Sequence, residues 1–368
     1  MTLFDIDFSL AMHNRTGRYF IGRDLIETPG LPIGDVFYWR LASPPGGVLR
    51  RVAGRLQMLQ VRGRTLGGLW RWMPPRRSRR PLLHVDAYTV PTTVLRRCDI
   101  VLCHDVGPVT HPHLFPTDVG AIYRAIYQQM AEIGPHTVFI SNASRRDFER
   151  LHPGARPASS RVIYPAIHTD RVPGAGRRPT GVEAPFLLTV GSIGDRKNQQ
   201  RCIEAFARTG LARQGMRYVV CGGREPGAER VEAAARAAGE AAGIVLLPYV
   251  TDEELSWLYA NASGFVLVSL LEGFGMPVAE AVANGLVPLI SADSVLEEVA
   301  GKSALVADPN DVESIAVGMA ALAAMRPEEK MDRLRELTAA GARFDIAVIR
   351  AEWRRAFAEW SAAGERPD

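Results

Sequence analysis

Two glutamates separated by seven residues, Glu272 and Glu280, have the types and spacing that best fit ligand binding in this 368-residue chain. The apolar run 264–269 before them is typical of a buried parallel strand, and Pro277 is typical of the first turn of a helix. The free backbone N–H groups at the start of that helix belong to Phe274, Gly275 and Met276. Because a helix N-terminus attracts anions, carboxylates beside it suit a ligand that carries hydroxyls as well as phosphates.

A pair of adjacent cations, Arg196 and Lys197, is the second candidate, in a loop that begins at Gly191. The loop follows the apolar strand predicted over 186–190, and ligands of open α/β sheets collect outside the carboxyl ends of the strands. Arginine offers bidentate hydrogen bonds and lysine a point charge, so the pair could neutralise a diphosphate group. The lysine stands out because the 44 basic residues include only three lysines.

Two pairs of adjacent residues in the first half are further candidates. His104 and Asp105 follow the apolar strand predicted over 98–103, and Gly17 and Arg18 open the first helix. A glycine there permits close approach of the backbone to a substrate. We expect both pairs to line the same site.

Three residues that end strands of the second half, Gly222, Tyr249 and Val250, are weaker candidates for contact with a ligand. His111 and His113 lie close in sequence, but no further ligand follows at a suitable spacing, so we predict no metal site.

The segment from Glu272 to Ala281 resembles the E-x7-E signature of the retaining glycosyltransferase family four, often E-G-F-G-x-P-x-x-E-A followed by a G-x-P strand. One inserted residue precedes the proline here. The loop 191–198 is similar to the family's G-x-x-x-x-R-K-N, and His104-Asp105 to its H-D pair. The loop 14–19 resembles T-G-x-G-R-Y, with Tyr19 at the place of the second glycine.

The resemblance implies a retaining, metal-independent glycosyltransferase with a nucleotide-diphosphate sugar as donor substrate and no resident cofactor. It favours mannose from GDP-mannose, moved to a glycan or lipid-linked acceptor in bacterial surface polysaccharide synthesis. The residues implied in catalysis are Arg196, Lys197, Glu272 and His104. Those implied in donor binding are Gly191, Arg196, Lys197, Gly222, Tyr249, Val250, Glu272, Gly273, Phe274, Gly275, Met276 and Glu280. Those implied in acceptor binding are Gly17, Arg18, His104 and Asp105.

Apolar strands alternate with amphipathic helices along the chain, which predicts an α/β protein with parallel sheets. The Pro/Gly/Arg-rich stretch 171–185 interrupts this alternation and is predicted to be an interdomain linker. With the resemblance, this implies the GT-B fold, in which two Rossmann-like domains face a central cleft. We expect an acceptor domain over 1–172, a nucleotide-sugar domain over 173–345 and a final helix, 346–368, that returns to the first domain.

The net charge of +4 hides one strongly basic segment, because residues 50–80 hold ten arginines and no acid. Tryptophans and leucines interleave with these arginines, a composition that suits an anionic membrane surface. The alternative, a basic loop that packs its aromatics on its own domain, is equally compatible with the sequence. No recognition motif for nucleic acid accompanies the charge, so we expect no nucleic-acid partner.

No run of 18 apolar residues occurs and no signal peptide opens the chain, so we expect a cytoplasmic protein, peripheral on the inner face of the cell membrane if the basic segment binds there. The four cysteines lack metal-ligand spacing and are expected to be reduced core residues.

Two other functions remain open. A nucleotide-sugar epimerase of the GT-B fold would share the phosphate-binding residues but need no acceptor. A non-catalytic nucleotide-sugar-binding subunit would bind the donor without turnover.

Overall fold

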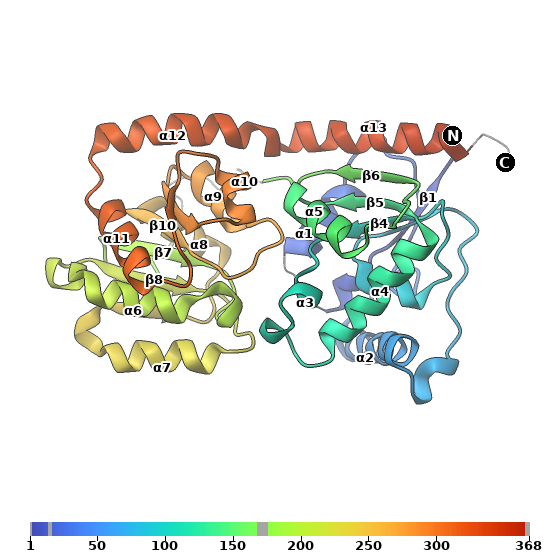
Figure 1. Ribbon diagram of the computed structural model, residues 1–368, viewed down its shortest axis with the longest axis horizontal. Helices are drawn as coiled ribbons and strands as arrows, with labels where there is room; N and C mark the ends of the chain where they lie inside the picture. The colour runs from blue at the N-terminus through green and yellow to red at the C-terminus, as the bar shows by residue number, and fades with distance from the viewer. Residues whose placement is uncertain (1, 14–16, 168–175, 365–368) are drawn as a thin grey trace. The chain divides into compact units, whose positions relative to one another are not determined.

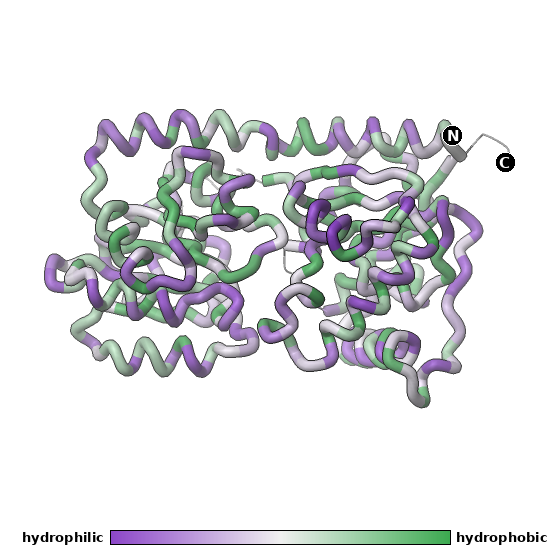
Figure 2. The backbone as a smooth tube through the Cα atoms, in the orientation of Figure 1, coloured by the Kyte–Doolittle hydropathy of each residue, from purple (hydrophilic) through white to green (hydrophobic). Residues whose placement is uncertain are grey.

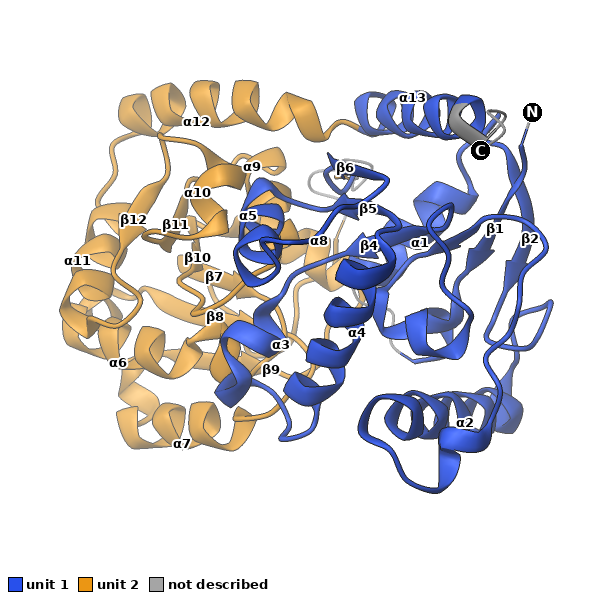
Figure 3. Ribbon diagram, turned by 45° about the vertical axis from the view of Figure 1, so that its right-hand side comes forward, with its two compact units in different colours: residues 1–166, 346–368 blue, residues 167–345 orange. Residues whose placement is uncertain are grey.

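The computed structural model describes residues 2–13, 17–167 and 176–364, and divides the chain into two compact units (Figures 1 and 3). Unit 1 comprises residues 1–166 and 346–368, and unit 2 comprises residues 167–345. The predicted boundary at 172/173, the first part of the predicted linker and residues 14–16 of the predicted glycine loop lie outside the described residues. Within the described ranges, no helix is both long and apolar enough to cross a membrane.

Unit 1 is built on a six-stranded parallel sheet with the order β2-β1-β3-β4-β5-β6. Its strands are β1 (Phe4–Asp7), β2 (Ile33–Phe37), β3 (Leu82–His84), β4 (Ile100–Cys103), β5 (His136–Phe139) and β6 (Ser159–Val162). Its helices are α1 (Gly17–Ile26), α2 (Gly47–Leu66), α3 (Gly107–Thr110), α4 (Val119–Ile133), α5 (Asn142–Leu151) and α13 (Ile346–Gly364). Strand β4 is fully buried along its length, as expected for a parallel sheet covered on both faces.

The last helix, α13, packs on the sheet of unit 1. The ring of Phe357 contacts that of Phe4 with centroids 5.0 Å apart, and Trp360 donates from Nε1 to Ser159 Oγ at 3.0 Å. Glu359 forms an ion pair with Arg161. One apolar face and two polar contacts thus attach residues from the end of the chain to strands β1 and β6.

Unit 2 contains a second six-stranded parallel sheet, with the order β12-β11-β10-β7-β8-β9. Its strands are β7 (Phe186–Val190), β8 (Arg217–Cys221), β9 (Ile244–Leu247), β10 (Gly264–Leu267), β11 (Pro288–Ser291) and β12 (Leu305–Ala307). Its helices are α6 (Gln199–Thr209), α7 (Ala228–Ala238), α8 (Asp252–Asn261), α9 (Met276–Ala283), α10 (Val295–Ala300), α11 (Val312–Ala323) and α12 (Pro327–Gly341). The hydrophobic segments concentrate in the strands, whereas α12 is largely hydrophilic (Figure 2).

Each sheet contains a point where the strand order reverses. In unit 2 the chain runs from β7 outward to β8 and β9, and then continues on the other side of β7 with β10, β11 and β12. In unit 1 the reversal lies between β1 and β3. Loops at the carboxyl ends of strands on the two sides of such a point diverge and leave a crevice, which is the usual ligand position in this kind of sheet.

The basic segment is mostly a helix, which the sequence analysis did not predict. The buried face of α2 includes Ala53, Gln57, Gln60 and Val61. Gln60 Oε1 accepts a hydrogen bond of 2.7 Å from Trp39 Nε1, and its amide nitrogen donates to Pro74 O at 3.1 Å. Glutamines with specific partners replace part of the apolar stripe, and this obscures the helical period of the sequence.

Candidate functional site

The cation loop, residues 191–198, is held against the loop that follows β8. Gly191 N donates to Cys221 O at 2.9 Å, and Ile193 N donates to Gly223 O at 2.8 Å. Gly222 has φ +149°, and a Cβ at this position would lie 2.1 Å from Gly191 O. The two loops can therefore approach so closely only because residue 222 is a glycine.

Two amide side chains complete the cation loop. Gln199 Oε1 accepts from Gly194 N at 3.0 Å, and its Nε2 donates to Ser192 O at 2.9 Å. Asn198 has a left-handed backbone with φ +58°, and its Nδ2 donates to Val268 O at 3.0 Å and to Pro309 O at 2.7 Å. These contacts fix the backbone on which Arg196 and Lys197 stand.

Glu272 and the two cations form one buried cluster. Lys197 Nζ pairs with Glu272 Oε1, and Arg196 Nη1 lies 3.3 Å from Glu272 Oε2. Ser269 Oγ donates to Glu272 Oε1 at 2.8 Å. The Lys197 and Glu272 side chains are each only 7% exposed. Leu270 N also donates to Arg196 O at 2.9 Å, so the loops after β7 and β10 are joined through backbone as well as side chains.

The charges in this cluster stabilise one another. Burial alone would raise the pKa of the Glu272 carboxyl, but Lys197 and Arg196 outweigh that effect and hold its pKa below the ordinary value. Burial lowers the pKa of the Lys197 ammonium, opposed by Glu272. Glu272 is therefore an anion at neutral pH.

A second acid, Glu225, approaches Arg196 from the loop after β8. Its Oε1 lies 3.4 Å from Arg196 Nη2, and this buried oxygen has no hydrogen-bond partner among the described residues. Glu225 was not among the residues predicted from the sequence. The available signal was its place three residues after Gly222, at the end of a strand adjacent to β7 in the sheet.

The helix that carries Glu280 begins where the sequence predicted, within one residue. Helix α9 starts at Met276 after Gly275, whose φ is +99° and whose added Cβ would lie 2.2 Å from Leu296 Cδ2. Phe274 is buried and packs edge-on against Phe344, with ring centroids 5.1 Å apart.

The Glu280 carboxylate has a partner that the sequence did not reveal. Tyr259 Oη donates to Glu280 Oε2 at 2.9 Å from helix α8. At the end of β9, the side chain of Tyr249 is 80% exposed.

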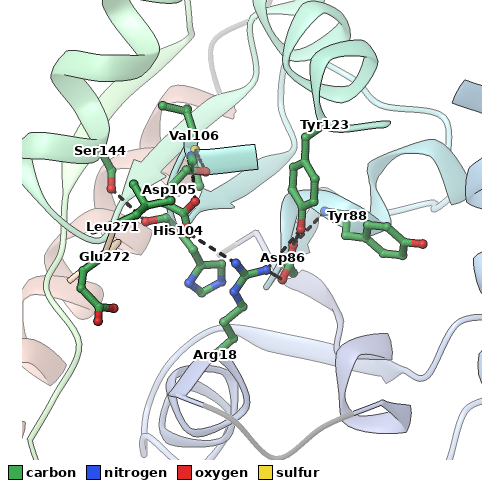
Figure 4. Close-up of polar contacts among 12 residues, drawn as sticks. Arg18, Asp86, Tyr88, His104, Asp105, Val106, Tyr123, Ser144, Leu271 and Glu272 are labelled. Carbon is green, nitrogen blue, oxygen red and sulfur yellow. Dashed lines mark hydrogen bonds and ion pairs between the residues drawn. The ribbon is translucent and has the colours of Figure 1, made fainter. Parts of the chain in front are cut away.

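In unit 1, a second charged cluster lies at the carboxyl ends of β1, β3 and β4 (Figure 4). Arg18 Nη1 lies 3.0 Å from Asp86 Oδ2 and donates to Tyr123 Oη at 3.2 Å, while Nη2 lies 3.3 Å from Asp105 Oδ2. The structure thus brings together the predicted residues Arg18 and Asp105. Asp86 and Tyr123 were not predicted, because they are distant in sequence from both motifs.

His104 has a defined tautomer in this cluster. Its Nε2 lies 2.8 Å from Val85 O, and a carbonyl only accepts, so Nε2 carries the proton. Burial lowers the pKa of the imidazole, with Asp86 opposing, so the ring is neutral at pH 7. Nδ1 is buried with no hydrogen-bond partner in the part of the chain that the structure describes. The lone pair of Nδ1 is therefore not used by any of the described residues.

Gly17 is the first residue of α1 and lies directly before Arg18. In the described ranges, no three His, Cys, Asp or Glu side chains form a group that could hold a metal ion.

Glycosyltransferases are among the known proteins that this chain is similar to. Residues 177–339 match the family described as glycosyl transferases group 1. The chain is 30% identical over 223 residues to an O-antigen chain mannosyltransferase B from Escherichia coli, covering 58% of each protein. It is 26% identical over 260 residues to the serotype-specific mannosyltransferase WbdA from Escherichia coli, covering 63% of this chain and 30% of WbdA. The chain thus spans less than two thirds of either relative.

Two solved structures support the fold. The structure of WaaG, a glycosyltransferase involved in lipopolysaccharide biosynthesis, matches with a TM-score of 0.65 and 15% identity over 97% of this chain and 99% of that one. An α,α-trehalose-phosphate synthase from Burkholderia vietnamiensis matches with a TM-score of 0.63 and 16% identity, over 86% of this chain and 78% of the synthase. The expected α/β fold of GT-B type, with two Rossmann-like halves, is confirmed.

Proposed function

We propose that this protein is a retaining glycosyltransferase of family four that transfers a hexose, with mannose favoured, from a nucleotide-diphosphate sugar. The acceptor is a glycan or lipid-linked glycan of bacterial surface polysaccharide synthesis. The observation that carries the proposal is the buried cluster of Arg196, Lys197 and Glu272 at the point where the strand order of unit 2 reverses. This cluster combines cations for phosphate with a carboxylate for hydroxyls.

Arg196 and Lys197 bind the diphosphate and stabilise the negative charge that develops on it as the sugar leaves. Fixed cations in a water-poor site provide the largest catalytic contribution in many enzymes. The N-terminus of α9 after Gly275 adds a further favourable dipole. These chain-borne charges are the basis for proposing metal-independent transfer.

Glu272 accepts hydrogen bonds from hydroxyls of the transferred sugar, and Glu280 accepts hydrogen bonds from hydroxyls of the ribose. Tyr259 supports the second assignment because its hydroxyl orients the Glu280 carboxylate. Gly191 and Gly222 lie in the two adjoining loops of the donor site, where Gly222 permits the close approach of the Gly191 backbone. The exposed ring of Tyr249 and the backbone of Val250 contact the base. The backbone from Gly273 to Met276 completes the donor site.

Retention follows if the acceptor attacks from the face that the diphosphate leaves, through an oxocarbenium-like transition state. The departing phosphate takes the proton of the acceptor hydroxyl. No residue is assigned as a nucleophile.

The preference for mannose rests on the relatives named above, both described as mannosyltransferases. The acceptor is assigned to Gly17, Arg18, His104 and Asp105 of unit 1. The lone pair on His104 Nδ1 supports this assignment, because it can accept a hydrogen bond from a sugar hydroxyl.

We also propose that α2 and the turn after it contact an anionic membrane surface. Apolar side chains on this segment remain exposed, namely Val48, Leu49, Val52, Met58, Leu66, Leu69 and Trp72. Leu69 is 85% exposed and Trp72 is 71% exposed, with the Trp72 ring stacked on Trp70. Exposed arginines without an intervening acid surround them, which suits anionic headgroups above an apolar layer.

The proposed function is tested by nucleotide release. Thermal-shift screening of the full chain against GDP, UDP and dTDP sugars identifies the donor, because a ligand that binds only the folded state stabilises it. Turnover is then followed with and without acceptor glycans, and the anomeric configuration of the product is read by NMR. Release that depends on acceptor, with retention, supports the proposal.

Conversion of the donor without acceptor favours the epimerase. Binding without turnover on any acceptor favours the non-catalytic subunit. A protein that none of these nucleotide sugars stabilises contradicts the proposed donor site.

A further inference from the structure

Glu272 pairs with the same two cations that bind the diphosphate in the proposed function. Its Oε1 pairs with Lys197 Nζ, and its Oε2 lies 3.3 Å from Arg196 Nη1. Arg196 Nη1 also donates to Leu271 O at 3.4 Å, and Arg196 Nη2 lies 3.4 Å from Glu225 Oε1. Both cations are therefore already engaged by acids of the chain itself, and a phosphate that binds them competes with a carboxylate.

This competition should affect a nucleoside diphosphate more than a nucleotide sugar. Glu272 is only 7% exposed, and among the described residues its other hydrogen-bond donor is Ser269 Oγ. A buried carboxylate that loses its cations is unfavourable unless other donors replace them. A nucleoside diphosphate brings no such donors to Glu272. A nucleotide sugar brings the hydroxyls of its sugar.

We infer that Glu272 is an internal competitor for the phosphate-binding cations, which makes affinity at this site depend on the sugar and weakens binding of the free nucleoside diphosphate. This inference rests on the proposed function, since it assigns the same site to a nucleotide-sugar donor. Its consequence is discrimination between donor and product. The intact donor compensates Glu272 with hydroxyls, whereas the nucleoside diphosphate product leaves Glu272 to regain Arg196 and Lys197 and is released.

The chain contains a matched control for the general effect of removing a negative charge. Glu225 is also an acid beside Arg196, but its Oε1 at 3.4 Å makes no hydrogen bond. Removal of its charge should strengthen binding of GDP and of GDP-mannose to the same degree. Only Glu272 combines contact with both cations and the proposed contact with sugar.

The experiment is calorimetric titration of the full chain with GDP and with GDP-mannose, for the wild type and for E272Q, E225Q and S269A. For E272Q we expect GDP to bind about tenfold tighter or more, the scale of one charge-assisted hydrogen bond, while GDP-mannose gains less. The ratio of the affinity for GDP-mannose to the affinity for GDP therefore falls. S269A removes the hydroxyl that donates to Glu272 but keeps the charge, so Glu272 loses its cations at a higher cost. This variant should therefore weaken binding of GDP more than binding of GDP-mannose and shift the ratio in the opposite direction, by a smaller factor. E225Q should leave the ratio unchanged. If screening selects UDP or dTDP instead, that nucleotide and its sugar replace the GDP pair.

The outcomes distinguish failure of the inference about Glu272 from failure of the proposed function. Wild-type binding of both ligands with an unchanged ratio in E272Q and S269A overturns the inference and leaves the donor site standing. An equal shift of the ratio in E225Q also overturns it, because charge alone would then explain the effect. Failure of the wild type to bind any nucleotide or nucleotide sugar removes the proposed function and the inference with it. Circular dichroism identifies a variant that does not fold, in which case S269A and E225Q decide.

Discussion

Asn198 and Pro309 are joined by a hydrogen bond of 2.7 Å across 111 residues of sequence, from the Asn198 side-chain amide to the Pro309 carbonyl. The same amide donates to Val268 O at 3.0 Å, and the Asn198 backbone is left-handed. One residue thus connects the cation loop to the end of β10 and to the loop after β12. The placement of Arg196 and Lys197 depends on this connection.

Replacing Asn198 should show how much the connection contributes. N198A removes the donor from the buried Val268 carbonyl and from the half-buried Pro309 carbonyl. It also places a Cβ-bearing residue without local hydrogen bonds at positive φ, so we expect a loss of about 2–3 kcal/mol in unfolding free energy. N198G relieves the backbone strain but not the lost hydrogen bonds, and should be less destabilised. Urea unfolding compares the three proteins. Equal stability of N198A and the wild type would contradict the assigned role.

Gly222 tests the close approach of the loops after β7 and β8. The Cβ of G222A would lie 2.1 Å from Gly191 O, so we expect destabilisation of about 1–3 kcal/mol and weaker nucleotide binding. Gly223 is the matched control, because nothing lies within 4 Å of its added Cβ. Thermal unfolding by circular dichroism should lower the Tm of G222A and leave that of G223A nearly unchanged. Similar Tm values for both variants would show that the loops can separate at little cost.

Lys197 should be needed for sugar transfer itself, beyond its contribution to the net charge or solubility of the protein. We expect K197A to reduce turnover by at least about 100-fold, because in the proposed function it removes one of the two cations that stabilise the leaving diphosphate. K302A removes the same charge from an exposed position and should transfer normally. Initial rates at saturating donor measure both, with folding checked by circular dichroism. Near-normal transfer by K197A would refute its role.

Neutral buried histidines should make the fold sensitive to acid. Burial, with Arg97 and Arg161 nearby, lowers the pKa of His136 to about 4, and burial also lowers the pKa of His84 and His104. The unfolded chain binds these protons near pH 6.5, so it holds more protons than the folded protein below that pH. The contribution of these histidines to the free energy of unfolding is therefore fully present above about pH 7 and decreases as the pH falls toward 4.

Urea unfolding at pH 7.5, 6.5 and 5.5 measures this dependence. H136Q should reduce the pH slope, because glutamine does not titrate and can still bond Ser159, which lies 2.8 Å from His136 Nδ1. A slope that is unchanged in H136Q would exclude this histidine as a contributor.

The exposed apolar residues after α2 should mediate membrane association. We expect L69S/W72S to reduce binding to vesicles that contain phosphatidylglycerol, and high salt to weaken binding of the wild type through the arginines. V317S is the matched control, since Val317 is 61% exposed on α11 of unit 2. Vesicle co-sedimentation compares them. The membrane proposal is rejected if the wild type does not sediment with these vesicles, or if L69S/W72S sediments as well as V317S.

The sequence by itself determined the fold class and the start of the helix that carries Glu280, and it was the basis for proposing the donor site. Regular apolar strands indicated parallel sheets, Gly275 and Pro277 indicated the start of α9, and the Arg196-Lys197 pair indicated a phosphate site. These features depend on neighbouring residues, on periodicity and on turn chemistry, so a single sequence carries them. Helix α2 was not predicted from the sequence, because Gln57 and Gln60 on its buried face have hydrogen-bond partners that no local pattern reveals.

Only the tertiary structure decided which residues contact one another within each site. The strand order of unit 2 places the ends of β7, β8 and β10 side by side, and this brings Glu225 and Glu272 to Arg196. In unit 1 the strand order likewise brings Asp86 to Arg18, across 68 residues of sequence. Adjacency of strands is a long-range property set by how the sheet assembles. No spacing along the chain encodes it.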